Sequence, residues 1–146
     1  MIREFYEPLT SEAGIELSTD CDAELTAEVD RSLFQRAIGN LVANAVAHTP
    51  RDGSIQIRGR NAGTALLIEV SDTGQGIAAE HLPHVFDCFY RIDPNRSKTD
   101  GNTGLGLAIV KSIAILHSGS VEIESVVAVG TVVKVRLPKA AKSIAA

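Results

Sequence analysis

The sequence of 146 residues has no tryptophan, only 4% aromatic residues and two cysteines, Cys21 and Cys88. Two cysteines do not make a disulfide framework, so we expect a reducing compartment. The chain also lacks an apolar run near the roughly 18 residues that span a bilayer, and no signal peptide opens it. A basic surplus is missing too, because the formal net charge is −4. This balance argues against a nucleic-acid partner.

The rest of the composition is ordinary for a soluble globular domain, with 45% hydrophobic and 22% charged residues. A chain of this length buries roughly two-thirds of its unfolded surface, so it needs neither disulfide nor metal to fold. No internal repeat or domain boundary interrupts it. We therefore expect one domain over residues 1–138 and a disordered, Ala/Lys-rich tail over 139–146.

Apolar spacing predicts the elements of this domain. Steps of three and four residues predict four helical segments: one that starts or kinks at Pro8 and stops at Gly14, one from Asp30 to His48, a short piece over 78–86 and one over 105–117. Alternation of apolar and polar residues predicts strands at 15–17, 25–29, 55–57, 66–70, 121–123 and 133–137. Most of these strands are joined as hairpins. We therefore predict an α+β two-layer sandwich, with a mixed, mostly antiparallel sheet packed on one face by helices.

Three polar residues, Asn40, Asn44 and His48, recur at steps of four along the second predicted helix. This spacing places them on one helix face. Two carboxamide oxygens on one face can coordinate a hard cation such as Mg²⁺, which takes few protein ligands and completes its coordination shell with phosphate and water. The alternative is a solvent-facing polar stripe, which these residues alone favour because Asn is common at helix surfaces.

A second pattern, Asp72-Thr-Gly74-Gln-Gly76-Ile77, follows directly on a predicted strand. Glycines let a backbone approach a ligand closely, and a carboxylate at a strand end can accept a hydrogen bond from that ligand. The alternative is a plain connection between a strand and a helix.

Glycines also open the last predicted helix, in Gly104-Leu105-Gly106-Leu107. Exposed N–H groups at a helix N-terminus favour a phosphate. The pattern is neither a P-loop nor the dinucleotide fingerprint. The polar segment before it, over 93–102, is long enough to be functional or mobile, and the alternative is a flexible loop.

An aromatic cluster, Phe86, Phe89 and Tyr90, ends in Arg91, whose guanidinium can reach a phosphate. The alternative is a small satellite core under the following loop. The same stretch contains His81, His84 and Cys88, which one helix face could present to a metal. No fourth ligand is evident, and the neighbouring phenylalanines favour packing.

The order of these four patterns resembles the ATP-binding catalytic domain of sensor histidine kinases. Residues 40–45 are similar to the N box of that family, 72–77 to the G1 box, 86–91 to the F box and 104–110 to the G2 box. The resemblance covers residues 1–138 and implies the Bergerat fold, which gyrase shares, with ATP and Mg²⁺ as cofactors. Residues 91–96 and 106–113 are similar, more narrowly, to the copper- and heavy-metal-responsive sensor kinases.

The resemblance also implies roles for individual residues. Asp72 would accept the adenine amino group, and Gly76 would let the base approach the backbone. Asn44 would bind Mg²⁺ with Asn40 nearby, and His48 would take the place of a basic residue that faces phosphate. The catalytic set would be Asn40, Asn44 and Arg91. The remaining nucleotide contacts would be Gly74, Ile77, Phe89, Tyr90, Gly104, Leu105, Gly106 and Leu107, under a lid of about 91–103.

The resemblance implies a kinase because related ATPases carry a water-activating Glu at the position of Asn40, and Asn cannot take a proton. The γ-phosphate would pass to a histidine on a separate dimerisation domain. None of the four histidines of this sequence lies in an acceptor-type pattern. The chain is thus expected to be a monomeric, cytoplasmic part of a homodimeric, inner-membrane-anchored bacterial sensor, which would reach a response regulator through the dimerisation domain. A non-catalytic nucleotide-binding regulator and an ATP hydrolase of the same fold remain alternatives.

Overall fold

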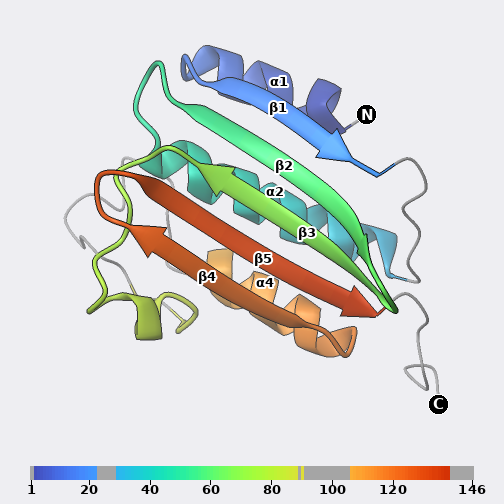
Figure 1. The fold of residues 1–146 in the computed structure, drawn as a ribbon. Coiled ribbons are helices and arrows are strands. Elements are labelled where there is room, and N and C mark those ends of the chain that lie inside the picture. Colours follow the sequence, from blue (N-terminus) through green and yellow to red (C-terminus); the bar gives the residue numbers. More distant parts are fainter. Residues whose placement is uncertain (1, 23–28, 89, 91–105, 139–146) are drawn as a thin grey trace.

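The computed structural model describes residues 2–22, 29–88, 90 and 106–138, and these residues form one sheet with helices on one face (Figure 1). The helices are α1 (Ile2–Glu12), α2 (Arg31–His48), the short 3₁₀ helix η1 (Leu82–His84) and α4 (Gly106–Leu116). The strands are β1 (Glu16–Cys21), β2 (Ser54–Ala62), β3 (Ala65–Asp72), β4 (Ser120–Val126) and β5 (Gly130–Pro138).

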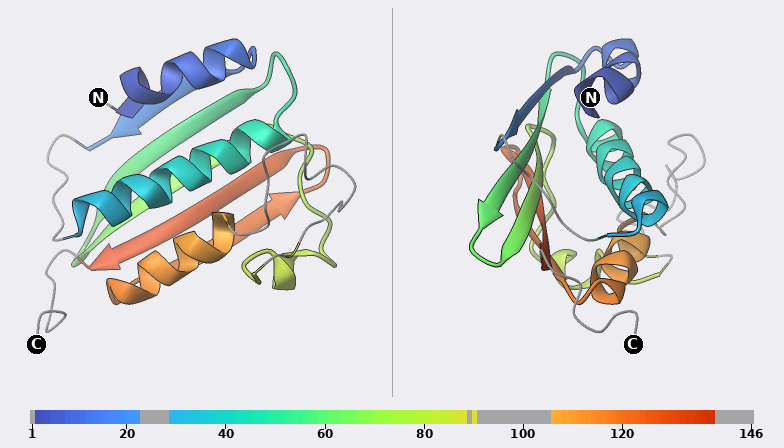
Figure 2. Two further views of the ribbon diagram at one scale, coloured as in Figure 1. Left: turned by 180° about the vertical axis from the view of Figure 1, so that it is seen from behind. Right: turned by 90° about the vertical axis from the view of Figure 1, so that its right-hand side faces the viewer.

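The sheet has the strand order β1-β2-β3-β5-β4. Strand β1 runs parallel to β2, and every other neighbouring pair is antiparallel. Figure 2 shows α1, α2 and α4 in a single layer on one side of this sheet. The predicted two-layer α+β sandwich with a mixed, mostly antiparallel sheet is therefore confirmed.

The hydrophobic core fills the space between the sheet and the helices α2 and α4. Leu41 and Val42 of α2, Val110 of α4, and Ile55 and Ile57 of β2 are at most 1% exposed. The predicted periodicities account for this burial, because steps of three and four bring one helix face to the sheet and alternation brings one strand face to the helices. No helix among the described residues is both long and apolar enough to cross a membrane.

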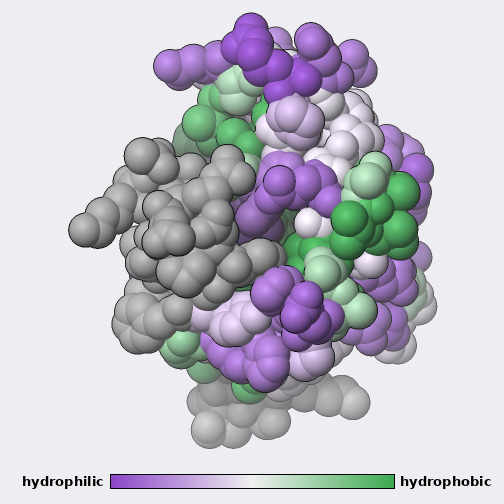
Figure 3. Space-filling model, turned by 90° about the vertical axis from the view of Figure 1, so that its left-hand side faces the viewer, coloured by the Kyte–Doolittle hydropathy of each residue, from purple (hydrophilic) through white to green (hydrophobic). Residues whose placement is uncertain are grey.

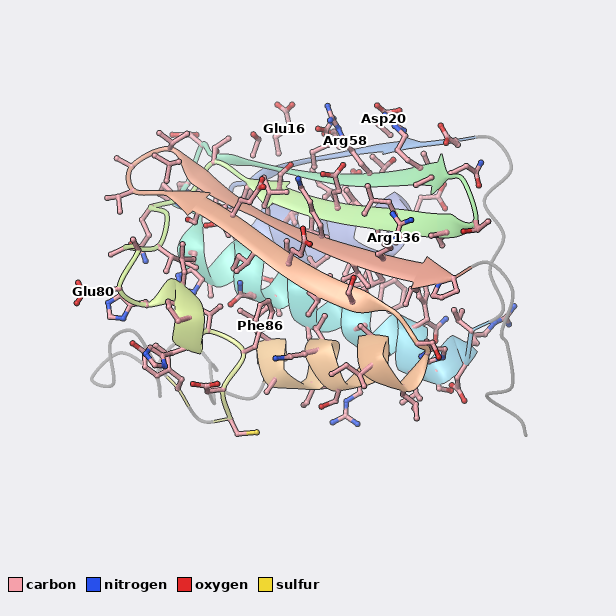
Figure 4. The ribbon with its side chains drawn as sticks, turned by 60° about the horizontal axis from the view of Figure 1, so that its bottom comes forward. Glu16, Asp20, Arg58, Glu80, Phe86 and Arg136 are labelled. Atoms are coloured by element: carbon pink, nitrogen blue, oxygen red, sulfur yellow. The ribbon has the colours of Figure 1, made fainter. Side chains whose placement is uncertain are left out.

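The outer face of the sheet carries a row of alternating charges that crosses all five strands. Its members are successive register partners: Asp20, Arg58, Glu69, Lys134 and Glu122. Figure 4 shows Asp20 and Arg58 projecting away from the helical layer. Opposite charges on neighbouring strands each contribute about 0.2–1 kcal/mol. The sequence thus places charged side chains on the sheet face that lies opposite the helices, and two of them form ion pairs, Asp20 with Arg60 at 2.6 Å and Lys134 with Glu124 at 3.3 Å.

Local signals explain where α2 begins and ends and where α1 ends. Asp30 caps α2 by accepting a hydrogen bond from the Leu33 N–H at 2.9 Å, and α2 ends at His48 before Pro50, as predicted. Gly14 follows α1 in the left-handed conformation, with a φ of 74°, which fits the predicted stop.

Two predicted elements differ from the structure, and for a third the structure decides between two alternatives. The first helix begins at Ile2 and contains Pro8, so a start at Pro8 is wrong, and the alternative that places Pro8 inside the helix agrees with the structure. Of the strand predicted over 25–29 only Val29 is described, and it is not in a strand. The helix predicted over 78–86 is reduced to η1, since Pro83 has no N–H and the chain forms bonds three residues apart instead, such as His84 N–H to His81 O at 2.9 Å.

The substitution Leu41→Ala should lower the free energy of unfolding by about 2–5 kcal/mol, because it opens a cavity between α2 and the sheet. Urea denaturation with an unchanged m-value would measure this loss. Ile115→Ala on α4 is the control, because Ile115 is 60% exposed and its loss should cost less than about 0.5 kcal/mol. Equal effects of the two variants would contradict the described packing.

Candidate functional site

The candidate site lies at one end of the sandwich, where the end of α2, the loop after β3 and the β4–β5 turn meet. We call residues 74–77 the base loop. The Gln75 N–H donates to His48 O at 3.1 Å, and the Ala128 N–H of the β4–β5 turn donates to Gln75 O at 2.8 Å. Figure 3 shows this end of the molecule, where polar side chains border a hollow. Segments distant in sequence thus share one surface.

A row of polar side chains marks the point where the apolar inner face of the sheet ends. Asp72 is the register partner of Thr131, and Thr131 is the register partner of Ser125. All three share the face of the core residues Val70 and Val133, because side chains alternate along a strand. The row replaces hydrophobic packing with groups that must be hydrogen-bonded.

Asp72 is only 9% exposed. Its Oδ1 accepts a hydrogen bond from the Gly74 N–H at 2.8 Å, and the Thr131 N–H also donates to this carboxyl. Burial raises the pKa of Asp72, while the Gly74 N–H, the nearby His48 and the Thr131 N–H partly offset that rise. The carboxyl is therefore held at a fixed place by backbone donors.

The two glycines of the base loop are required by the protein's own packing. A Cβ on Gly74 would lie 2.2 Å from His48 O, and a Cβ on Gly76 would lie 2.2 Å from Val126 O. Gly76 also has a φ of 74°, which disfavours other residues. The glycines let the loop press against α2 and the β4–β5 turn. Their approach to a bound base stays a prediction.

The α2 face that carries Asn40, Asn44 and His48 is half-buried at all three positions. The Asn40 Nδ2 donates to the Gly106 O at the start of α4 at 3.4 Å. The His48 Nδ1 lies 3.2 Å from the Gln75 Nε2, which can only donate, so this ring nitrogen acts as an acceptor. The face is turned towards α4 and the base loop, and the simple solvent-facing stripe is wrong for Asn40 and His48.

The other predicted site residues surround this face in part. Gly106 begins α4, and Ile77 and Leu107 are buried at 4% and 9% exposure. The Tyr90 hydroxyl contacts the His81 Nδ1 at 2.5 Å, and the Tyr90 ring stacks on His84. Phe89, Arg91, Gly104, Leu105 and the lid predicted over 91–103 lie outside the described residues.

The aromatic cluster serves in part as the satellite core that was the alternative. Phe86 packs against the main core, and the Lys111 Nζ lies 5.9 Å from the centre of its ring. Figure 4 shows Phe86 next to α4. This packing anchors the segment that leads to Tyr90.

The metal site suggested by His81, His84 and Cys88 is not formed. Within the described ranges no three His, Cys, Asp or Glu side chains lie together as metal ligands. His81 contacts Tyr90, and the His84 Nδ1 lies 3.1 Å from the Asp87 Oδ2. The reason is local, because the helix that would have placed the three residues on one face is replaced by η1.

The sequence interpretation missed Ser125, Thr131 and the turn residue Ala128. A signal was present, since polar residues occupy the inward positions 125 and 131 in strands that are otherwise apolar on that face. Reading this signal requires the register of β4 with β5, which the sequence alone does not supply.

Comparisons with known proteins identify a matching family and several similar proteins. The family described as histidine kinase-, DNA gyrase B-, and HSP90-like ATPase matches residues 29–141. The sensor protein IrlS of Burkholderia pseudomallei is 43% identical over 121 residues, which are 83% of this chain and 26% of that protein. The sensor histidine kinase CusS of Escherichia coli is 39% identical over 122 residues, 84% of this chain and 25% of that protein. This chain therefore spans about a quarter of these relatives.

A solved structure agrees over nearly the whole chain. The catalytic domain of the histidine kinase ThkA superposes with a TM-score of 0.81 at 26% identity, covering 95% of this chain and 88% of that domain. This chain therefore has the fold of a histidine kinase catalytic domain.

The free energy of unfolding of Asp72→Asn, compared with that of wild type at the same pH, should increase as the pH rises from about 4 to 7. Because the folded-state pKa of Asp72 is raised, its contribution to stability is complete below the unfolded pKa and is lost as the pH rises through the folded pKa. The Asn oxygen can still accept from the Gly74 N–H. Urea denaturation across this pH range would measure the difference.

The matched control is Asp20→Asn, for which the opposite sign is expected. The hydrogen bond from Arg60 lowers the pKa of the exposed Asp20, so its contribution is present above the unfolded pKa and is lost as the pH falls. The control variant should therefore lose a little stability relative to wild type as the pH rises. The same slope for both variants would contradict the assigned burial of Asp72.

Proposed function

The chain belongs to the family of histidine kinase-, DNA gyrase B-, and HSP90-like ATPases, and from this membership we propose that it is the ATP-binding catalytic domain of a two-component sensor histidine kinase. In this function the γ-phosphate of ATP passes to a histidine on a separate dimerisation domain. The observation that carries the proposal is the buried Asp72 carboxyl beside the glycine-rich base loop. Two named relatives of this chain are sensor proteins.

Asp72 is proposed to accept the exocyclic amino group of adenine. An ionised carboxylate has two oxygens with about four acceptor positions, and the N–H groups of Gly74 and Thr131 occupy only part of this capacity. In a buried site, a further hydrogen bond to a charged acceptor contributes about 1.5–3 kcal/mol. The backbone at Gly74, Gly76 and Ile77 would then lie along the base.

The phosphate end is proposed to lie between α2 and the start of α4. The donor set fits Mg²⁺, because Asn40 and Asn44 offer carboxamide oxygens and half-buried positions on one helix face. Asn44 would hold the ion, with Asn40 nearby, and bound Mg²⁺ would neutralise charge on the phosphates. The N–H groups of Gly106 and Leu107 at the start of α4 favour an anion.

The remaining phosphate contacts are proposed from sequence. Arg91, Gly104 and Leu105 would complete this end, beneath a lid of about 91–103. Phe89 and Tyr90 would support the approach to Arg91, and His48 would lie near the phosphates. Of this group the described residues are Tyr90 and His48, and both are already anchored to neighbouring side chains.

Asn40 favours phosphoryl transfer to another protein over hydrolysis. A carboxamide cannot accept a proton from water at neutral pH, and the Asn40 Nδ2 is engaged with Gly106 O. A hydrolase of the same fold, and a regulator that binds nucleotide without transferring phosphate, are the competing functions.

The parent protein is proposed to be a homodimeric bacterial sensor anchored in the inner membrane, with this domain in the cytoplasm. Its partners would be the dimerisation domain, which carries the acceptor histidine, and a response regulator that takes the phosphate from that histidine. Similarity of residues 91–96 and 106–113 to metal-responsive sensor kinases suggests a copper or heavy-metal signal. The names and bacterial sources of IrlS and CusS support a bacterial sensor as the parent protein.

Titration with a non-hydrolysable ATP analogue, with and without Mg²⁺, should separate the two ends of the site. Asp72→Ala should weaken binding by about 1.5–3 kcal/mol in both conditions, because the adenine amino group loses its charged partner. Asn44→Ala should abolish most of the gain in affinity that Mg²⁺ gives and leave metal-free binding nearly unchanged.

Asp20→Ala on the far side of the sheet is the control for both variants and should bind like wild type. Unchanged affinity of Asp72→Ala would contradict the adenine assignment. An equal loss by Asn44→Ala with and without Mg²⁺ would make Asn44 a structural residue.

A further inference from the structure

Ser125 is the last inward-facing residue of β4, and it lies next to the base loop. Its Oγ accepts a hydrogen bond from the Ile77 N–H at 2.7 Å. The same Oγ lies 3.0 Å from the Gly130 O and 2.8 Å from the Thr131 Oγ1. One hydroxyl on β4 therefore connects the base loop to the first two residues of β5.

These three contacts can be satisfied at the same time. A serine hydroxyl has one hydrogen to donate and two lone pairs that accept. If Ser125 donates to Gly130 O, it can accept from both the Ile77 N–H and the Thr131 hydroxyl. The hydrogen-bonding capacity of the side chain is then fully used, which gives Ser125 a defined orientation in a half-buried place.

We propose that Ser125 is a positioning residue for the nucleotide: its hydroxyl fixes the base loop against the sheet before adenine binds. This inference rests on the proposed function. Ser125 acts through Ile77 and Thr131 and needs no contact of its own with ATP.

The other anchors of the base loop show why Ser125 can be tested separately. The Gly74 N–H is held by Asp72, and the Gln75 N–H by the His48 O. Changing Asp72 would remove a proposed contact with ATP as well as an anchor, because its side chain makes both. The His48 anchor is a backbone carbonyl, which a substitution at position 48 would leave in place. Changing Ser125 removes an anchor and leaves the proposed contacts in place.

Ser125 also supports the carboxyl that is proposed to bind adenine. Thr131 donates its N–H to the Asp72 carboxyl, and Ser125 holds the Thr131 side chain from the neighbouring strand. A loop that becomes ordered only when the ligand binds loses conformational entropy at that moment, and this loss lowers the affinity. A base loop that is already held avoids much of that loss.

The test compares Ser125→Ala with Ser125→Thr, which keeps the hydroxyl, and with Ser120→Ala, which makes the same change on the exposed, opposite face of β4. Ser125→Ala should weaken binding of adenosine and ADP by a similar factor of about five to thirty, because the Ile77 N–H loses its acceptor. Its affinity for inorganic tripolyphosphate should not change. Ser125→Thr should restore most of the loss, and Ser120→Ala should bind like wild type.

Hydrogen exchange of the Ile77 amide, measured without nucleotide, is the second readout. Ser125→Ala should speed this exchange, and Ser120→Ala should leave it unchanged. Wild-type affinity for ADP in Ser125→Ala, or a loss that Ser125→Thr fails to restore, would overturn the proposal. Unchanged exchange at Ile77 would overturn it as well. If wild type itself binds no adenine nucleotide, the proposed function fails, and the exchange measurement still decides whether Ser125 fixes the loop.

Discussion

The carboxyl of Asp72, a residue that is 9% exposed at the end of β3, must replace the water it loses with donors from the protein, because an unpartnered buried charge is costly. The Gly74 and Thr131 N–H groups serve this purpose. For the N–H of residue 74 to donate to this carboxyl, the chain turns directly after β3 and passes close to the His48 O. This approach leaves no room for a Cβ at position 74. The need for a glycine at position 74 and the contact of the loop with α2 both fit the placement of one carboxyl there.

The two-layer fold gives this arrangement a rigid frame. The hydrophobic core under α2 and α4 fixes the face that carries Asn40 and Asn44, and the bond from Asn40 to Gly106 O joins that face to the start of α4. The strands are held by backbone pairing across the sheet, and the face opposite the helices carries charged side chains. The nucleotide is thus proposed to bind at an end of the sandwich where three independent elements are already held in place.

The sequence predicted the parts of the fold and site that depend on local spacing. Steps of four placed Asn40, Asn44 and His48 on one face, and alternation placed Asp72 at the end of a strand. It failed where a distant partner decides the outcome. The roles of Ser125 and Thr131 depend on strand register, which brings positions 72 and 125 to the same end of the sheet.

Transfer of phosphate to a histidine is the central claim, and one measurement tests it most directly. The chain would be mixed with the dimerisation domain of its parent protein and with ATP labelled at the γ-phosphate. Label on the dimerisation domain that is labile in acid and stable in base, the behaviour expected of phosphohistidine, is the predicted result. Steady release of inorganic phosphate without acceptor, or nucleotide binding with no labelled histidine, would contradict the account.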